Sequence, residues 1–322
     1  MRTNKLLSML LCIPLLIFSV SACADRRGEK SKIAVIVKAL DSDFWHSVKN
    51  GVDSAAAEYN VDVTFDGPEN EEDYANQNKM IMAAVQNGAD AIIISAIDFE
   101  KSADAVNKAA EKGIKVITID SNVNSKQVSM FIGTDNIEAG KRAGEAVIGC
   151  VPDGEEINIG LINYYKSTEN GMQREFGFRN YIDDISNADI MASVNVNSNT
   201  ESVVSAVTAL LAENPKINVL VGFNEWMTLG IGAAIQRLGL TGKVHGVGFD
   251  TNTAAVGMLE TGEIDTLIVQ NPFAIGYLGV KNAAELISGE SISQKGIYTN
   301  TVAVNKENLF DKDIQKMVFR FN

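Results

Sequence analysis

The chain has 322 residues, a formal net charge of −13, 46% hydrophobic residues and 21% charged residues. This balance is typical of a folded globular protein, and the length allows two domains of about 150 residues each. The strong negative charge excludes a protein that binds nucleic acid or anionic lipid headgroups, because both repel a surface of the same sign.

The first residues have the three-part pattern of a bacterial export signal. Two positive charges precede an apolar stretch over residues 6–20, which is too short for an ordinary transmembrane helix. Two small residues then stand directly before Cys23, which makes the pattern resemble a lipoprotein lipobox. A plain secretory signal with an incidental cysteine is the alternative. We expect a signal peptide over residues 1–22 and a protein that works outside the cytoplasmic membrane, anchored by a lipid on Cys23.

The segment after the signal predicts a tether and a chain without disulfides. Residues 23–31 are short, charged and without apolar periodicity, which is typical of a flexible, lipidated linker. Removal of the signal peptide takes away two positive charges and lowers the net charge from −13 by two, to −15. It also removes Cys12, and a lipidated Cys23 has no free thiol. Cys150 is then left alone, and we expect it to be a small apolar residue after a helix.

From Lys32 onward, short β-branched runs alternate with longer helical patterns. The apolar runs have the length of strands buried on both faces, and those of the first half are 33–37, 61–65, 91–94 and 116–119. A helical stretch ends in three alanines at 55–57, and an alanine-rich helix is expected from about Glu100 to Lys112, where Gly113 ends it. Repeated strand–helix–strand units predict a parallel sheet with helices on both faces.

The same alternation begins again in the second half of the chain. Its expected strands are 157–162, 190–196, 219–221 and 244–249, with helical patterns near 173–183, 201–213 and 227–238. The economical interpretation is an α/β fold of two doubly wound, Rossmann-like lobes. Ligands of such sheets bind beyond the carboxyl ends of the strands, so two lobes would place these ends on either side of one cleft.

The sequence has none of the common motifs for a metal, a nucleotide or a nucleophile. It holds two histidines without metal-ligand spacing, and no Cys-x-x-Cys, Gly-x-Ser-x-Gly or phosphate-binding glycine loop. Gly230-Ile231-Gly232 falls inside a helical pattern, which indicates close helix packing. We therefore expect no cofactor, no metal and no enzymatic activity.

Polar residues follow four of the apolar runs at the point where each run ends. They are Asp120, Asn224, Asp250 and Gln270, whose carboxylates and amides form planar hydrogen bonds that suit the hydroxyls of a sugar. Each of them alone could equally be a helix cap or a turn residue.

Two neighbouring aromatic residues, Phe44 and Trp45, begin the first helix, and aromatic rings stack on the apolar faces of sugars. The alternative is that one of the two rings packs into the core.

Further short motifs complete a pattern that spans residues 31–305. They comprise 132–136 with Gly140, Arg174 with Gly177-Phe178, 224–227 with Gly230, and 247–250. Together with the residues above, they make the chain resemble the substrate-binding lipoproteins of bacterial sugar ABC transporters. The resemblance is to the ribose- and galactose-binding class, the type 1 periplasmic binding proteins.

The resemblance implies two lobes that are joined by a three-segment hinge and close around one sugar. In this family the chain crosses between the lobes three times. The corresponding crossings here would place residues 31–134 and 271–301 in an N-terminal lobe and residues 135–270 and 302–322 in a C-terminal lobe. It implies a monomer that delivers the sugar to the permease subunits of an ABC transporter. Phe44 and Trp45 would sandwich the sugar ring. The hydroxyl groups of the sugar would form hydrogen bonds with Asp120, Arg174, Asn224, Asp250 and Gln270.

Three positions depart from the pattern of ribose-binding proteins. Ser42 stands where these have Asn, Ser121 stands where an Arg follows the Asp, and Lys38 stands where a small polar residue is usual. Residues 63–68 and Lys38 resemble the corresponding positions of receptors for autoinducer-2, but those receptors lack the Asp250 and Gln270 of this chain. We expect Ser42 and Lys38 in the cleft, where Lys38 either reaches the ligand or pairs with a carboxylate such as Asp120.

Because of these departures, the sequence does not identify the sugar, which could be a pentose, a hexose or a sugar derivative. A receptor for a sugar or an autoinducer-2-like molecule, which presents its closed form to a sensor kinase or chemoreceptor, is the main alternative. A repressor core shares the fold but lacks an export signal, and an enzyme would need a nucleophile paired with a base.

Overall fold

A computed structural model describes residues 29–291 and 293–319 of the chain. The predicted signal peptide, Cys23 and most of the predicted tether lie outside the described residues. Within these residues, no helix has both the length and the apolar character that a membrane crossing requires. Residues from Ser31 onward form one compact unit that contains two α/β lobes.

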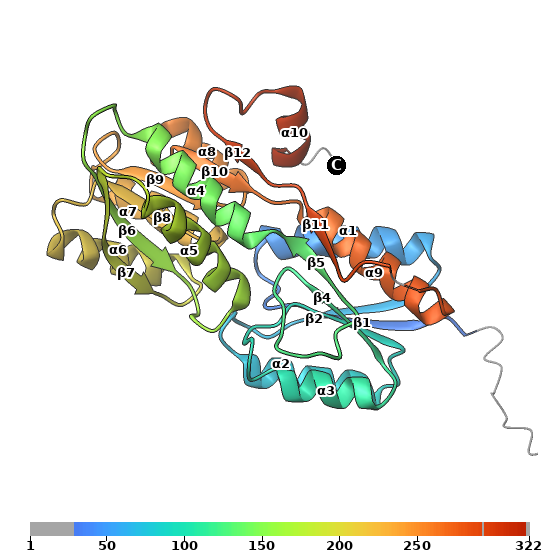
Figure 1. Cartoon of the computed structure of the whole chain (residues 1–322). Coiled ribbons are helices and arrows are strands. Elements are labelled where there is room, and N and C mark those ends of the chain that lie inside the picture. Colours follow the sequence, from blue (N-terminus) through green and yellow to red (C-terminus); the bar gives the residue numbers. More distant parts are fainter. Residues whose placement is uncertain (1–28, 292, 320–322) are drawn as a thin grey trace, which may run out of the picture. The chain divides into compact units, whose positions relative to one another are not determined.

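The first lobe is built on a six-stranded parallel sheet with the strand order β11-β5-β4-β3-β1-β2 (Figure 1). Its strands are β1 (Lys32–Ile36), β2 (Asp62–Asp66), β3 (Ala91–Ile94), β4 (Lys115–Ile119), β5 (Met130–Thr134) and β11 (Gly296–Thr299). Its helices are α1 (Asp43–Glu58), α2 (Tyr74–Gln86), α3 (Ala103–Glu111) and α9 (Pro272–Ser288). Helices α1 and α9 pack on one face of the sheet, and α2 and α3 on the other.

The second lobe repeats this design with the strand order β12-β10-β9-β8-β6-β7. Its strands are β6 (Ile157–Asn163), β7 (Ala188–Asn195), β8 (Val219–Gly222), β9 (His245–Phe249), β10 (Thr266–Val269) and β12 (Val302–Val304), of which only β12 is antiparallel to its neighbour among these described strands. Its helices are α4 (Asn136–Cys150), α5 (Glu169–Ile182), α6 (Thr200–Glu213), α7 (Glu225–Arg237), α8 (Thr253–Thr261) and α10 (Lys312–Val318). Both sheets are thus doubly wound, as the sequence predicts.

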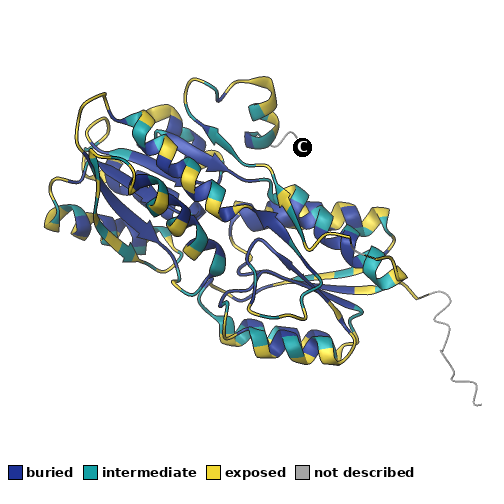
Figure 2. Ribbon diagram, viewed as in Figure 1, coloured by how far each residue is buried: buried dark blue, intermediate teal, exposed yellow. Residues whose placement is uncertain are grey.

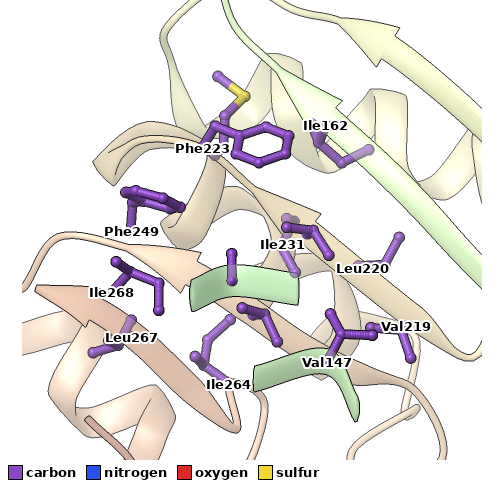
Figure 3. Packing of buried hydrophobic residues seen from close by; sticks show 14 of the residues in the cluster. Val147, Ile162, Val219, Leu220, Phe223, Ile231, Phe249, Ile264, Leu267 and Ile268 are labelled. Atoms are coloured by element: carbon purple, nitrogen blue, oxygen red, sulfur yellow. The ribbon is translucent and has the colours of Figure 1, made fainter. Parts of the chain in front are cut away.

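The central strands are buried because their residues are apolar on both faces. Figure 2 shows buried strands in each lobe beneath helices that are exposed on their outer faces. In the second lobe the core includes Ile162, Leu220, Phe223, Ile231 and Phe249, which pack together in Figure 3. The strand ends that carry the predicted polar residues are therefore fixed by two packed cores.

The chain passes between the sheets three times: after β5, after β10, and between β11 and β12. Two side-chain hydrogen bonds lie at these passages. The Thr134 hydroxyl donates to Gln270 Oε1 at 2.7 Å, and Arg142 Nη1 donates to the carbonyl of Thr301 at 3.1 Å. The three-segment connection between the two lobes is the one that the family resemblance implies.

Two helix starts differ from the expected ones by more than two residues. Helix α3 begins at Ala103, because the buried Asp98 accepts the backbone N–H groups of Glu100 and Lys101 and holds these residues in a turn. Helix α5 begins at Glu169, four residues before the expected start.

The interpretation of the Gly230-Ile231-Gly232 pattern is confirmed. A Cβ atom on Gly230 would lie 2.3 Å from the Cβ of Val203, so only glycine allows α6 and α7 to come this close.

Candidate functional site

A cavity of about 20 Å³ lies between the lobes, and residues from both lobes line it. All nine side chains that the sequence predicts for the ligand site line this cavity: Lys38, Ser42, Phe44, Trp45, Asp120, Arg174, Asn224, Asp250 and Gln270. Five further residues, which the sequence analysis missed, complete the lining: Glu71, Tyr164, Asn170, Glu225 and Trp226. The cavity is thus lined by charged, amide and aromatic side chains.

Arg174 is a rigid element of this cavity, with only 1% of its surface exposed. Its Nε donates to Asn136 Oδ1 at 2.9 Å, Nη1 to the carbonyl of Phe223 at 2.7 Å, and Nη2 to Gln270 Oε1 at 2.8 Å. Its guanidinium carbon also lies 4.6 Å from the centre of the Phe249 ring. These contacts fix the direction of the guanidinium group, and with it the amide of Gln270.

The close packing of α4 on α5 determines the position of Arg174 in the cavity wall. A Cβ atom on Gly140 would lie 2.0 Å from the carbonyl oxygen of Arg174, and one on Gly177 would lie 2.0 Å from that of Ile137. The two helices therefore approach with glycine on each side of the contact. A larger residue at either position would push Arg174 away from its acceptors.

Asp120 and Asp250 share an unusual backbone conformation at the ends of β4 and β9. Their φ angles are 57° and 69°, in the left-handed region that Asp and Asn tolerate better than other residues with a side chain. Both carboxylates line the cavity from opposite lobes. Each aspartate thus lies at a strand end and also adopts a backbone conformation that few other residue types tolerate.

Asp250 is the carboxylate with the most strongly shifted titration in the cavity. Burial raises its pKa to about 7, and the neighbouring Glu225 and Asp120 act in the same direction, whereas Arg174 and the hydrogen bond from Gln270 oppose the shift. Gln270 Nε2 donates to its Oδ1 at 2.7 Å. Among the described residues, no side chain or backbone group donates to its Oδ2, so this oxygen is free to accept a bond from a ligand.

Lys38 pairs with Asp120, which is one of the two roles expected for it. Its Nζ lies 2.9 Å from Asp120 Oδ2 and is 5.7 and 5.6 Å from the ring centres of Trp45 and Tyr164. Asp120 also accepts the Ser95 hydroxyl at 2.9 Å and the Asn170 amide at 3.0 Å. Asp120 therefore fixes the position of the lysine ammonium group at the cavity wall.

The expected sandwich of a sugar ring by Phe44 and Trp45 is wrong for this conformation. Their ring centres lie 4.9 Å apart with an interplanar angle of 89°, so they touch edge to face and leave no room between them. Both rings belong to the core of the first lobe and both line the cavity. Each offers only part of one surface to a ligand, because neighbouring residues of a helix point in different directions.

Helix capping, which the sequence left open as an alternative for the four polar residues at strand ends, applies to one of them. Asn224 caps α7 by accepting the N–H of Met227. Ser42, for which the sequence predicted no cap, caps α1 by accepting the N–H of Trp45. Asp120, Asp250 and Gln270 cap no helix, since Asn252 and Asn271 occupy the cap positions of α8 and α9. Capping does not remove Asn224 and Ser42 from the cavity, which both of them line.

Two missed residues, Glu225 and Trp226, follow Asn224 directly and so belong to a motif that the sequence analysis had identified. Glu225 Oε2 accepts the backbone N–H of Phe44 at 3.2 Å, so a carboxylate of the second lobe meets the start of α1 in the first. Burial raises the pKa of Glu225. Glu71 and Asn170 carry no such signal, because their places depend on loop conformation and on how the lobes meet. Tyr164 directly follows β6, so its position at a strand end could have pointed to it.

Comparison with known proteins gives a consistent result. Residues 33–291 match the model of the periplasmic binding protein domain. The D-ribose/D-allose-binding protein of Pseudomonas aeruginosa is 26% identical over 280 residues, which cover 84% of this chain and 87% of that protein.

Two solved structures are similar over 90% of the chain. A carbohydrate transporter solute-binding protein from Agrobacterium radiobacter, in complex with D-arabinose, is 29% identical over 99% of its own length, with a TM-score of 0.87. An ABC transporter solute-binding protein from Agrobacterium vitis, with bound D-fucose, is 32% identical over its full length, with a TM-score of 0.86. Together with the two doubly wound lobes and the cavity between them, these matches show that the chain belongs to the family of type 1 periplasmic binding proteins.

Proposed function

We propose that this protein captures a sugar between its lobes outside the cytoplasmic membrane and delivers it to the permease of an ABC transporter. The observation that carries the proposal is the lining of the inter-lobe cavity, which comprises four carboxylates, two cations and three aromatic rings of Phe and Trp. Sugar sites need such planar hydrogen-bonding groups beside apolar surfaces. The sugars named for the similar solved structures, D-arabinose and D-fucose, support a pentose, a hexose or a derivative as ligand.

Each group in the cavity has a distinct proposed role. Asp250 Oδ2 accepts a hydrogen bond from a sugar hydroxyl. Arg174, Asn224 and Gln270 either donate hydrogen bonds to sugar hydroxyl oxygens or position the side chains that bind these hydroxyls. Lys38 donates to a ligand oxygen while Asp120 holds its ammonium group in place. Ser42, Phe44 and Trp45 form the wall contributed by the start of α1. Binding in this scheme needs no bond to break, and we propose a binding protein rather than an enzyme.

Closure of the lobes is the step that traps the ligand. We assign residues 31–134 and 271–301 to the N-terminal lobe and residues 135–270 and 302–322 to the C-terminal lobe, which agrees with the three passages of the chain between the sheets. A ligand that contacts both lobes stabilises the closed state by its additional contacts there. The permease then recognises the closed form as a monomer.

A thermal-shift screen tests the proposal. The protein without its predicted signal and Cys23 is heated with pentoses, hexoses, sugar alcohols, inositols and autoinducer-2. A ligand at 100 times its dissociation constant stabilises the folded protein by about 2.7 kcal/mol, which raises the melting temperature measurably. We expect a sugar to produce this rise. A rise with autoinducer-2 alone would favour the signalling alternative, and no rise with any compound would contradict sugar binding.

Lipid anchoring at Cys23 is a separate proposal that rests on the sequence pattern of residues 1–23. A Cys23→Ser variant lacks the thiol that carries the lipid, so we expect it to move from the membrane fraction to the soluble extracytoplasmic fraction. Immunoblots of both fractions measure this, with Cys150→Ser as the control that stays with the membrane. Equal membrane attachment of the Cys23→Ser variant would contradict the lipobox.

A further inference from the structure

Glu71, a residue of the loop after β2, lines the cavity although no sequence motif points to it. We propose that Glu71 is a positioning residue of the sugar site: it orients the Trp45 ring and fastens the two lobes together at the cavity wall. This inference rests on the proposed function, because it assigns a role within the same site.

The loop that carries Glu71 is held firmly at both ends. Gly67 at its start lies against Val37, the residue directly after β1, since a Cβ atom there would be 3.1 Å from the carbonyl oxygen of Val37. In the middle, the side chain of Asn70 accepts the backbone N–H of Glu72 at 3.2 Å, and Asp73 caps α2 at the end. Glu71 is 7% exposed, so its carboxylate has a fixed and nearly dry environment.

The two carboxylate oxygens of Glu71 serve the two lobes separately. Oε1 accepts the indole Nε1–H of Trp45, in its own lobe, at 3.0 Å. Oε2 accepts the Ser198 hydroxyl at 3.1 Å and the Asn224 amide at 3.4 Å, both from the opposite lobe. One carboxylate thus links an aromatic ring and an amide that both line the cavity.

The partners of Glu71 are neutral donors. Among the described residues, no nitrogen of Lys, Arg or His lies within 4.0 Å of its carboxylate, so its charge is stabilised by the three hydrogen bonds above. Hydrogen bonds to a charged acceptor are stronger than those between neutral groups. A buried indole N–H without an acceptor would destabilise the folded protein by the full desolvation penalty of that group. Trp45 is only 2% exposed, so Glu71 determines where this ring rests.

Neighbouring groups reinforce the contact between the lobes at this point. Glu72 Oε1 accepts the backbone N–H of Ser198 at 2.7 Å. The adjacent carboxylates of Glu71 and Glu72 therefore both form hydrogen bonds with Ser198 of the second lobe. A second cavity of about 300 Å³ lies beyond, and Glu71 and Trp226 line both it and the inner cavity. Glu71 therefore forms part of the wall that separates the inner cavity from the outer one.

The test combines two substitutions with a matched control. Glu71→Ala removes both sets of bonds, whereas Glu71→Gln keeps an oxygen for Trp45 but loses the charge and directs an amide N–H₂ at Asn224. Glu69→Ala changes an exposed glutamate of the same loop. Because each 1.4 kcal/mol is tenfold and bonds to a charged group contribute about 1.5–3 kcal/mol, we expect Glu71→Ala to raise the dissociation rate of the sugar by about 10- to 100-fold. The association rate stays nearly constant, and Glu69→Ala behaves as the unsubstituted protein does.

A fluorescence measurement without ligand tests the hold on Trp45 independently. Trp45 and Trp226 are the two tryptophans of the chain, so a Trp226→Phe background isolates Trp45. In that background we expect a changed emission maximum for Glu71→Ala, and an unchanged one for Glu71→Gln and Glu69→Ala. An unchanged emission or an unchanged dissociation rate in Glu71→Ala overturns the inference. If no sugar binds the unsubstituted protein, the proposed function fails, and the emission comparison still decides the role of Glu71.

Discussion

Replacement of Asp250 by asparagine is expected to raise the dissociation constant for the sugar by about 10- to 100-fold, because a hydrogen bond to a charged group contributes about 1.5–3 kcal/mol and each 1.4 kcal/mol is tenfold. Asp250 has one oxygen engaged by Gln270 and the other free to accept from a ligand. Asparagine keeps an oxygen for Gln270 but presents an amide donor to the ligand. Asparagine also tolerates the left-handed backbone, with φ at 69°, that alanine would strain. Titration calorimetry at pH 8, above the pKa of about 7 to which burial raises Asp250, measures the affinity.

The control for this variant is the same substitution on the surface. Asp184→Asn changes an exposed aspartate after α5, and we expect it to bind as the unsubstituted protein does. Circular dichroism and the melting temperature show whether both variants fold. A folded Asp250→Asn variant with unchanged affinity would remove Asp250 from the site.

The second large effect is a loss of stability of the ligand-free protein as the pH rises. Burial raises the pKa of Asp250 from 3.8 to about 7, so the folded state holds a proton that the unfolded state releases near pH 4. This contribution to stability is complete below about pH 4 and is lost as the pH rises toward 7. A shift of this size corresponds to about 4 kcal/mol, since one pKa unit is 1.36 kcal/mol. Glu225 and Glu72, whose pKa values burial also raises, act in the same direction.

Denaturant unfolding at several pH values checks this effect. Asp250→Asn is neutral throughout, so its stability should match that of the unsubstituted protein near pH 4 and exceed it near pH 8. The difference between the two curves isolates Asp250 from all other titrating groups. Parallel curves across this range would show that Asp250 is ionised in the folded protein at every pH above 4.

Much of the fold could be predicted because strand-length apolar runs leave little choice of structure. The runs at 91–94 and 219–221 form β3 and β8 at almost the same bounds, since both faces of these strands are buried. Helix starts were harder to predict. The turn made by Asp98 before α3 depends on a side chain bonding to the backbone, and an alanine-rich sequence does not reveal it.

The candidate site was most directly predictable where a residue follows a strand. Asp120, Asp250 and Gln270 lie directly after β4, β9 and β10, so the parallel sheet brings them to the cavity. Glu71 and Asn170 reach the same cavity through a loop and through the meeting of the lobes, which no local pattern encodes. The relation of Phe44 to Trp45 was missed for a similar reason, since the edge-to-face contact depends on how α1 packs into the core.

The most direct test of sugar binding between the lobes is a crystal structure of the protein with the sugar that raises its melting temperature most. We predict electron density for one sugar in the inter-lobe cavity, with Asp250 Oδ2 within hydrogen-bonding distance of a hydroxyl and Lys38 within hydrogen-bonding distance of a ligand oxygen. Density for the sugar at any other place, with this cavity holding only solvent, would contradict the account.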